Sequence, residues 1–101
     1  MTRGTTPTIS FTFSEEELDI RMVDYAELTI SQNQKNVLIK KLFYDSTEGA
    51  FSVALTEQET LQLKPGQCQL QVKIKLTDKN VISTNIETIY VNEILNGEVM
   101  L

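Results

Sequence analysis

Histidine and tryptophan are absent from this 101-residue sequence, and cysteine occurs only once. Without histidine, the chain has no His-based catalytic triad, no histidine metal ligand and no imidazole base that titrates near neutral pH. The single cysteine, Cys68, rules out an intrachain disulfide and, with histidine absent, a zinc site of the Cys/His kind. These absences exclude the commonest chemistry of small enzymes and metalloproteins.

Glycine and proline are scarce, with four and two residues. The glycines are isolated from one another, so the chain has no glycine-rich phosphate loop. No apolar run approaches the length of a membrane span, and the first residues lack the apolar segment of a secretion signal. We therefore expect no membrane partner and a protein that is cytoplasmic when made.

Positive charge is outweighed, because 9 Lys and Arg face 14 Asp and Glu for a formal net charge of −5. An acidic chain repels phosphate backbones, so we expect no nucleic-acid partner. The densest acidic cluster, Glu15 to Glu17 with Asp19, lacks the spacing and the central glycine of a calcium loop. We interpret it as a solvated loop and expect neither a metal nor a cofactor.

One regular pattern dominates what is present. From Gln67 to Leu76 every even position is apolar and every odd position is an amide or a lysine. Alternation with a period of two predicts a strand with one face on a core and the other in water. Cys68 falls on the apolar face, so we expect a buried core residue rather than a reactive thiol.

Similar patterns predict five further strands, at residues 8–13, 21–31, 37–44, 51–55 and 81–91. The apolar positions of the last strand change parity between Glu87 and Thr88, which predicts a β-bulge there. Thr56 and Glu59 have the spacing of a capping box, which predicts one helical turn from Glu57 to Leu61.

Short turns between these strands predict an all-β protein, an antiparallel immunoglobulin-like β-sandwich of about six to seven strands. A compact barrel is the alternative. The length predicts one domain over residues 1–101, because two halves would each be too small to bury a core.

Few side chains suggest a ligand site. Asp24 interrupts the apolar face of its strand and is the best candidate for a catalytic acid, although a rim position or a bulge that turns it outward explains it better. Tyr25 and Tyr44 could stack on sugar rings from neighbouring strands. The C-terminal segment is unusually apolar for a chain end, and its candidate contact residues are Ile94, Leu95, Val99, Met100 and Leu101.

The sequence around Pro65 to Val72 and Thr77 to Thr84 resembles the late hairpin of immunoglobulin-like modules. Over most of its length the chain is similar to a family of small proteins of phages and prophages of Gram-positive bacteria. The matching segments are Arg3-Gly4-Thr5-Thr6-Pro7-Thr8, Ile30-Ser31-Gln32, Leu55-Thr56-Glu57-Gln58-Glu59-Thr60-Leu61 and Val91-Asn92-Glu93-Ile94-Leu95. The resemblance implies a virion, tail or baseplate-associated accessory protein and carries no catalytic residue.

These observations lead to one main hypothesis and one alternative. The main hypothesis is a non-enzymatic phage or prophage structural protein whose partners are other phage structural proteins or further copies of itself, located in the virion. The alternative is a carbohydrate- or host-surface-binding module that uses Tyr25 and Tyr44.

Overall fold

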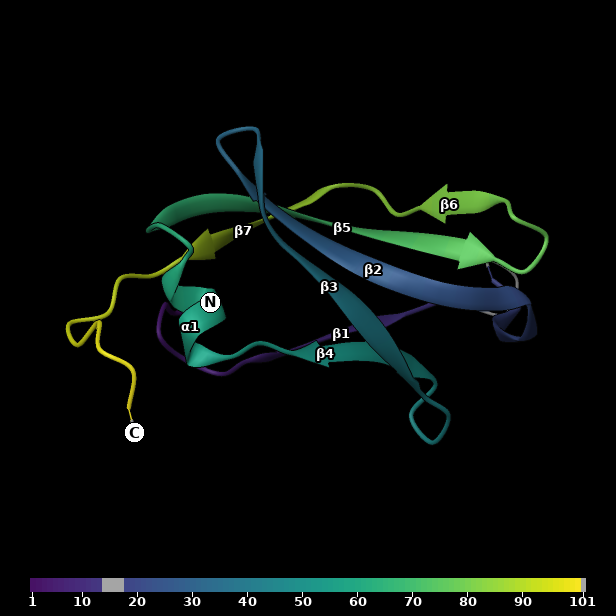
Figure 1. Ribbon diagram of the computed structural model, residues 1–101, viewed down its shortest axis with the longest axis horizontal. Helices are drawn as coiled ribbons and strands as arrows, with labels where there is room; N and C mark the ends of the chain where they lie inside the picture. Colours follow the sequence, from purple (N-terminus) through teal and green to yellow (C-terminus); the bar gives the residue numbers. More distant parts are fainter. Residues whose placement is uncertain (14–17, 101) are drawn as a thin grey trace.

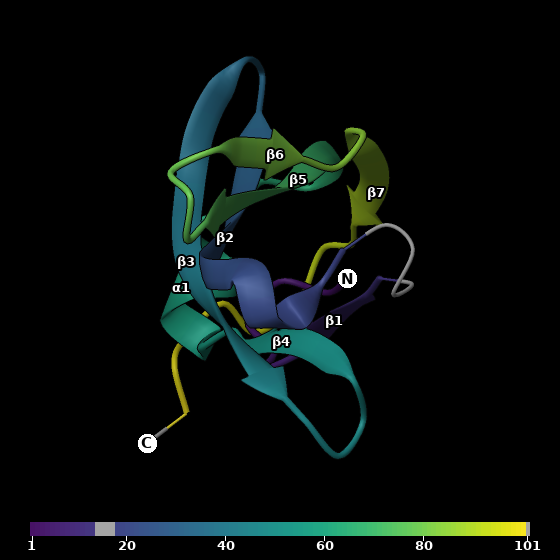
Figure 2. The same cartoon turned by 90° about the vertical axis from the view of Figure 1, so that its right-hand side faces the viewer.

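The computed structural model describes residues 1–13 and 18–100, and its strands form one antiparallel sheet in the order β1-β4-β3-β2-β5-β6, with β7 also paired to β5 (Figure 1). The sheet curls into a half-barrel, visible when the strands are viewed end-on in Figure 2. The predicted all-β, antiparallel class is therefore confirmed. The strands are β1 (Thr8–Thr12), β2 (Val23–Gln32), β3 (Lys35–Asp45), β4 (Ala50–Ala54), β5 (Gly66–Leu76), β6 (Val81–Ser83) and β7 (Glu87–Val91).

The curl of the sheet is produced by β3, which changes partner along its length. Up to Leu42, which lies opposite Ala26, the strand pairs with β2. Its last residues, Phe43 to Asp45, pair with β4 instead. A strand that leaves one neighbour for another bends the sheet, so the β1–β4 ribbon faces the β2–β5 layer across the core.

The core is filled from both sides of this fold. Even-numbered residues of β5 from Cys68 to Ile74 are buried, whereas the odd-numbered residues point to the outer face. They meet Phe51, Val53 and Leu55 from the opposite ribbon in one apolar cluster. The alternation seen in the sequence thus predicted correctly which face of β5 is buried, including the position of Cys68.

A short helix, α1 (Glu57–Leu61), connects β4 to β5 within the bounds predicted for one helical turn. The capping box is present, because Thr56 Oγ1 accepts from Glu59 N at 3.1 Å and Glu59 Oε1 accepts from Thr56 N at 2.9 Å. The second oxygen of Glu59 pairs with Lys40 Nζ at 2.8 Å, which ties the helix to β3.

The predicted strand over residues 81–91 is divided into β6 and β7. The register shifts by one residue between the pairs Lys73–Ser83 and Leu70–Glu87, so an extra residue is present as expected for a bulge. The irregularity lies at residues 84–86 rather than between 87 and 88. Thr84 fixes it there, because its hydroxyl accepts from Val72 N at 3.0 Å and its own N–H donates to Val72 O at 2.9 Å.

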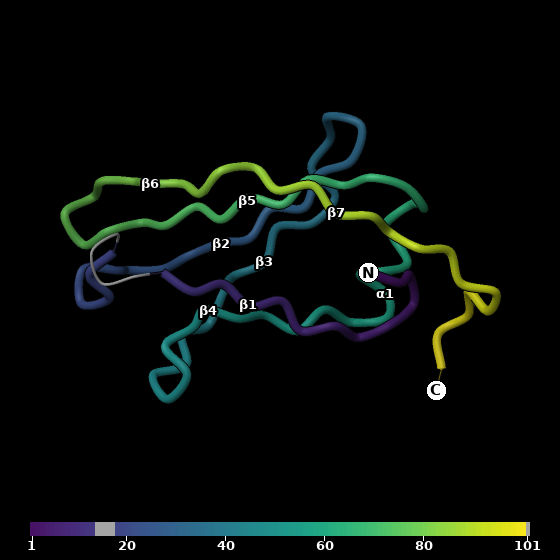
Figure 3. Tube along the Cα trace, turned by 180° about the vertical axis from the view of Figure 1, so that it is seen from behind, coloured from purple at the N-terminus to yellow at the C-terminus, as the bar shows by residue number. Residues whose placement is uncertain are grey.

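The first residues of the chain extend the same sheet. Thr2 pairs in parallel with Asn92, and Asn92 N donates to Met1 O at 2.7 Å. The N-terminal segment therefore pairs at both sides of the sheet. Thr2 lies beside the residue that follows β7, and β1, a few residues later, pairs with β4. Both chain ends lie at the end of the molecule that carries α1 (Figure 3). None of the helices described here is long and apolar enough to cross a membrane.

Candidate functional site

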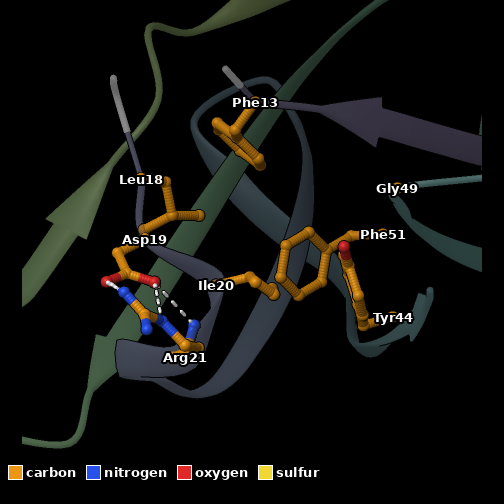
Figure 4. Close-up of a pocket in the computed structure, with 8 residues that line it drawn as sticks. All are labelled: Phe13, Leu18, Asp19, Ile20, Arg21, Tyr44, Gly49 and Phe51. Atoms are coloured by element: carbon orange, nitrogen blue, oxygen red, sulfur yellow. Dashed lines mark hydrogen bonds and ion pairs between the residues drawn. The ribbon is translucent and has the colours of Figure 1, made fainter. Parts of the chain in front are cut away.

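A pocket of about 470 Å³ opens at the end of the half-barrel that lies opposite α1 in Figure 1, and its lining residues are drawn in Figure 4. Its walls combine apolar and polar surface and come from three parts of the chain, the residue after β1, the segment around η1 (Ile20–Met22) and the β3–β4 ribbon. Phe51 is the central wall residue, with the Phe13 ring 6.0 Å away edge-on and the Tyr44 ring 5.1 Å away. Aromatic pairs at these separations hold one another in place, so the walls are well packed.

One ion pair lies at the rim of this pocket. Asp19 caps η1 by accepting from Arg21 N at 3.0 Å, and its second oxygen lies 3.0 Å from Arg21 Nη2 (Figure 4). The hydrogen bonds from Arg21 lower the pKa of the Asp19 carboxyl. The carboxylate therefore stays ionised and engaged, and among the described lining residues no other acid or base faces the pocket. The pocket therefore presents apolar side chains beside one ion pair.

The structure brings Tyr25 and Tyr44 to one shallow pocket of about 330 Å³, at the point where β3 leaves β2. Tyr25 is on the outer face of β2, with Lys41 Nζ 5.1 Å from its ring centre, whereas Tyr44 packs on Phe51.

The apolar C-terminal segment divides into a packed part and an exposed part. Ile94 is half-buried and lies against Gly4 and Leu61, where a Cβ on Gly4 would come within 3.3 Å of both side chains. Leu95 is fully exposed, Met100 is 78% exposed and Val99 is 36% exposed. Leu101 lies outside the described residues. The segment is held beside α1 because Met100 N donates to Glu57 Oε2 at 2.9 Å.

Arg3 anchors this end of the molecule, a role that the sequence did not reveal. Its Nε donates to Leu63 O at 2.6 Å and its Nη2 to Leu61 O at 3.0 Å, so the guanidinium satisfies carbonyl groups at and beyond the C-terminus of α1. Its Nη1 pairs with Glu93 at 2.8 Å. The base of the C-terminal segment is thereby fixed to the N-terminal segment and to the helix.

The remaining candidates are separated from one another. Asp24 is exposed and lies where the β2–β5 register shifts, as expected for a bulge that turns its side chain outward. Cys68 is buried, and burial raises the pKa of its thiol. Glu15 to Glu17 lie outside the described residues. Over residues 1–13 and 18–100, no group of three acidic or cysteine side chains is placed to hold a metal ion.

The chain was compared with protein-family models, with curated proteins and with solved structures, and none of these comparisons gives a significant match.

Proposed function

We propose that the protein is a non-enzymatic structural or tail-associated protein of a phage or prophage, which assembles through its exposed C-terminal segment. The observation that carries this proposal is the position of Leu95 and Met100, two large apolar side chains that lie in water beside α1. Burying such a side chain at an interface is worth about 1.5–3 kcal/mol. An apolar segment that is fixed at its base and exposed beyond it has the form of an assembly contact.

The base of the segment supports this proposal. The Arg3–Glu93 pair and the packing of Ile94 limit the motion of the residues that follow. A contact segment that is already oriented loses less conformational entropy when it binds. Only the side chains from Leu95 onward are then offered to a partner, while Ile94 contributes to the fold of its own chain.

The arrangement of the strands is compatible with the immunoglobulin-like fold that the resemblance to phage proteins implies. A two-layer arrangement, with the β1–β4 ribbon opposite the β2–β5 layer, is the arrangement that an immunoglobulin-like sandwich would require. We therefore include an immunoglobulin-like relationship in the proposal. Phage structural proteins commonly act by docking, and a protein of that kind needs no catalytic group.

The test uses particles purified from an induced lysogen that carries the coding sequence. Mass spectrometry should detect the protein in the particles. The double variant Leu95→Ser/Met100→Ser should be depleted from them, while Phe43→Ser, which removes another exposed apolar side chain, should be retained. Absence of the unmodified protein from the particles would exclude the phage assignment.

Light scattering of the purified proteins addresses the contact itself. If the segment binds further copies of the chain, the unmodified protein should show a mass that rises with concentration, and the double variant should remain a monomer. Equal masses for both proteins, together with equal retention in the particles, would exclude the segment as an assembly contact.

A further inference from the structure

A second feature lies on the outer, solvent-facing side of the sheet, away from the C-terminal segment. It is a shallow groove of about 460 Å³, with β2 and β5 as its floor, the tip of the β2–β3 hairpin as one wall and the chain around β7 as the other. The volume is within the range of sites that bind small molecules. None of its lining residues belongs to the C-terminal segment, so its role does not depend on the assembly proposal.

The lining of the groove is uncharged and combines polar side-chain groups with apolar surface. Seven of its nine lining residues carry an amide or a hydroxyl group, and none is charged. The same face of the sheet carries Lys73 and Lys75 further along β5, so the lack of charge is local to the groove. Among the described residues, no hydrogen bond engages the side-chain amides of Gln34, Asn36 and Gln69, which remain available to a ligand.

Local irregularities of the sheet shape both walls. The β2–β3 register shifts between Ile30 and Ser31 beside one wall, and the one-residue bulge near Thr84 lies beside the other. Bulges change the direction in which side chains point. In the hairpin turn, Asn33 and Gln34 both have positive φ, of 51° and 65°, a conformation in which glycine is the favoured second residue. Gln34 therefore occupies a strained position from which it lines the groove.

We propose that this groove binds a neutral saccharide. A primary amide donates and accepts hydrogen bonds at once, which matches sugar hydroxyl groups that do the same. Ile86, which is 62% exposed, provides an apolar surface for the C–H face of a sugar ring. An anionic ligand would find no cation in the groove to pair with. A peptide strand cannot be added on the floor of the groove, because β2 and β5 already pair with neighbours on both sides and offer no free backbone edge.

The first test is an NMR titration of the ¹⁵N-labelled full chain, because side-chain amide groups give their own signals. The probes are maltotetraose, cellotetraose and tetra-N-acetylchitotetraose, with polygalacturonate as the charged comparator. At least one neutral sugar should shift the side-chain signals of Gln34, Asn36 and Gln69 and leave the backbone signals of β1 unmoved. Absence of shifts with all three sugars, or shifts with polygalacturonate alone, would overturn the proposal.

Three variants then separate binding from folding. Gln69→Ala removes an amide from the groove floor and should weaken binding of the responding sugar about two- to tenfold, the loss expected for one hydrogen bond. Gln67→Ala, on the same face of β5 but outside the groove, should bind as the unmodified protein does.

Gln34→Gly gives a result that a purely structural role cannot produce. It relieves the positive φ at position 34, so the thermal midpoint should rise, while the loss of the amide should weaken sugar binding. A more stable Gln34→Gly variant with weaker sugar binding would support saccharide binding in the groove. Unchanged affinity in both Gln34→Gly and Gln69→Ala, or an equal loss in Gln67→Ala, would overturn it.

Discussion

The side-chain amide of Gln32 pairs in both directions with the backbone of Lys64. Its Oε1 accepts from Lys64 N at 2.9 Å, and its Nε2 donates to Lys64 O at 2.7 Å. Gln32 is buried at the end of β2, and Lys64 lies between α1 and β5. A primary amide carries the same donor and acceptor as a peptide group. The Gln32 side chain therefore makes with Lys64 the pair of hydrogen bonds that the backbone of a neighbouring strand would make.

Replacing this amide should destabilise the fold. Gln32→Leu leaves the N–H and C=O of Lys64 without a partner in a part-buried position, and we expect a loss of about 2–4 kcal/mol in the free energy of unfolding. Urea unfolding followed by circular dichroism measures it. Gln67→Ala, an exposed glutamine on β5, is the matched control and should change stability by less than about 0.5 kcal/mol. Equal urea midpoints for the two variants would contradict this interpretation.

The anchoring role of Arg3 predicts that its replacement destabilises the protein more than replacement of Arg21 does. Arg3→Ala leaves the carbonyl groups of Leu61 and Leu63 without their donor and should cost about 1–3 kcal/mol of stability. Arg3→Lys should recover little, because an ammonium lacks the planar fork that reaches several acceptors. Arg21→Ala removes an exposed arginine from an ion pair of similar length and should cost less stability than Arg3→Ala, because an ion pair in water contributes little. Thermal unfolding of the three variants distinguishes these outcomes.

The Lys40–Glu59 pair should make stability depend on pH in the acid range. The hydrogen bond from Lys40 lowers the pKa of Glu59 in the folded protein. The folded state then binds this proton less readily than the unfolded state does, so the contribution is complete above the ordinary glutamate pKa of about 4.3 and is lost as the pH falls through the lower, folded value. Unfolding measured from neutral to acid pH should show a shallower decline in Glu59→Gln.

The control for this pH dependence is Glu48→Gln, which lies in an exposed turn. It should leave the acid-range slope unchanged. If Glu59→Gln has the same slope as the unmodified protein, the pair with Lys40 makes no pH-dependent contribution.

Cys68 should behave as a core residue. Burial raises the pKa of its thiol, so the nucleophilic thiolate is scarce as well as inaccessible. A disulfide reagent such as dithionitrobenzoate should react slowly with the native protein and rapidly in urea. Cys68→Ser should cost about 1–3 kcal/mol, because a hydroxyl group is buried among apolar neighbours, whereas Cys68→Ala should cost less. Fast labelling of the native protein would show that this part of β5 opens readily.

The sequence predicted best those features that depend on residues close together in the chain. The buried face of β5 follows from alternation alone, because a strand turns successive side chains to opposite sides. The capping box of α1 needs only Thr56 and Glu59 at the correct spacing. The extra residue near Thr84 was visible as a change of parity, but its position was not, since a threonine hydroxyl on Val72 decides it.

Features that combine distant segments could not be read in this way. The half-barrel depends on β3 exchanging β2 for β4, and that exchange depends on packing between layers. Arg3 meets its partners more than fifty residues away along the chain. The groove is assembled from β2, the β2–β3 hairpin, β5 and β7, and its glutamines look like ordinary solvent-facing residues when each strand is considered alone.

For this protein, the sequence by itself determined the strand class, the buried face of the longest alternating strand, the helical turn and the absence of histidine chemistry. These properties depend on composition and on short-range periodicity. Only the tertiary structure decided how the sheet curls, what Arg3 and Gln32 hold together, and which uncharged side chains share one groove. Each of these depends on hydrogen bonds and packing between segments that are far apart in the sequence and become neighbours only in the folded chain.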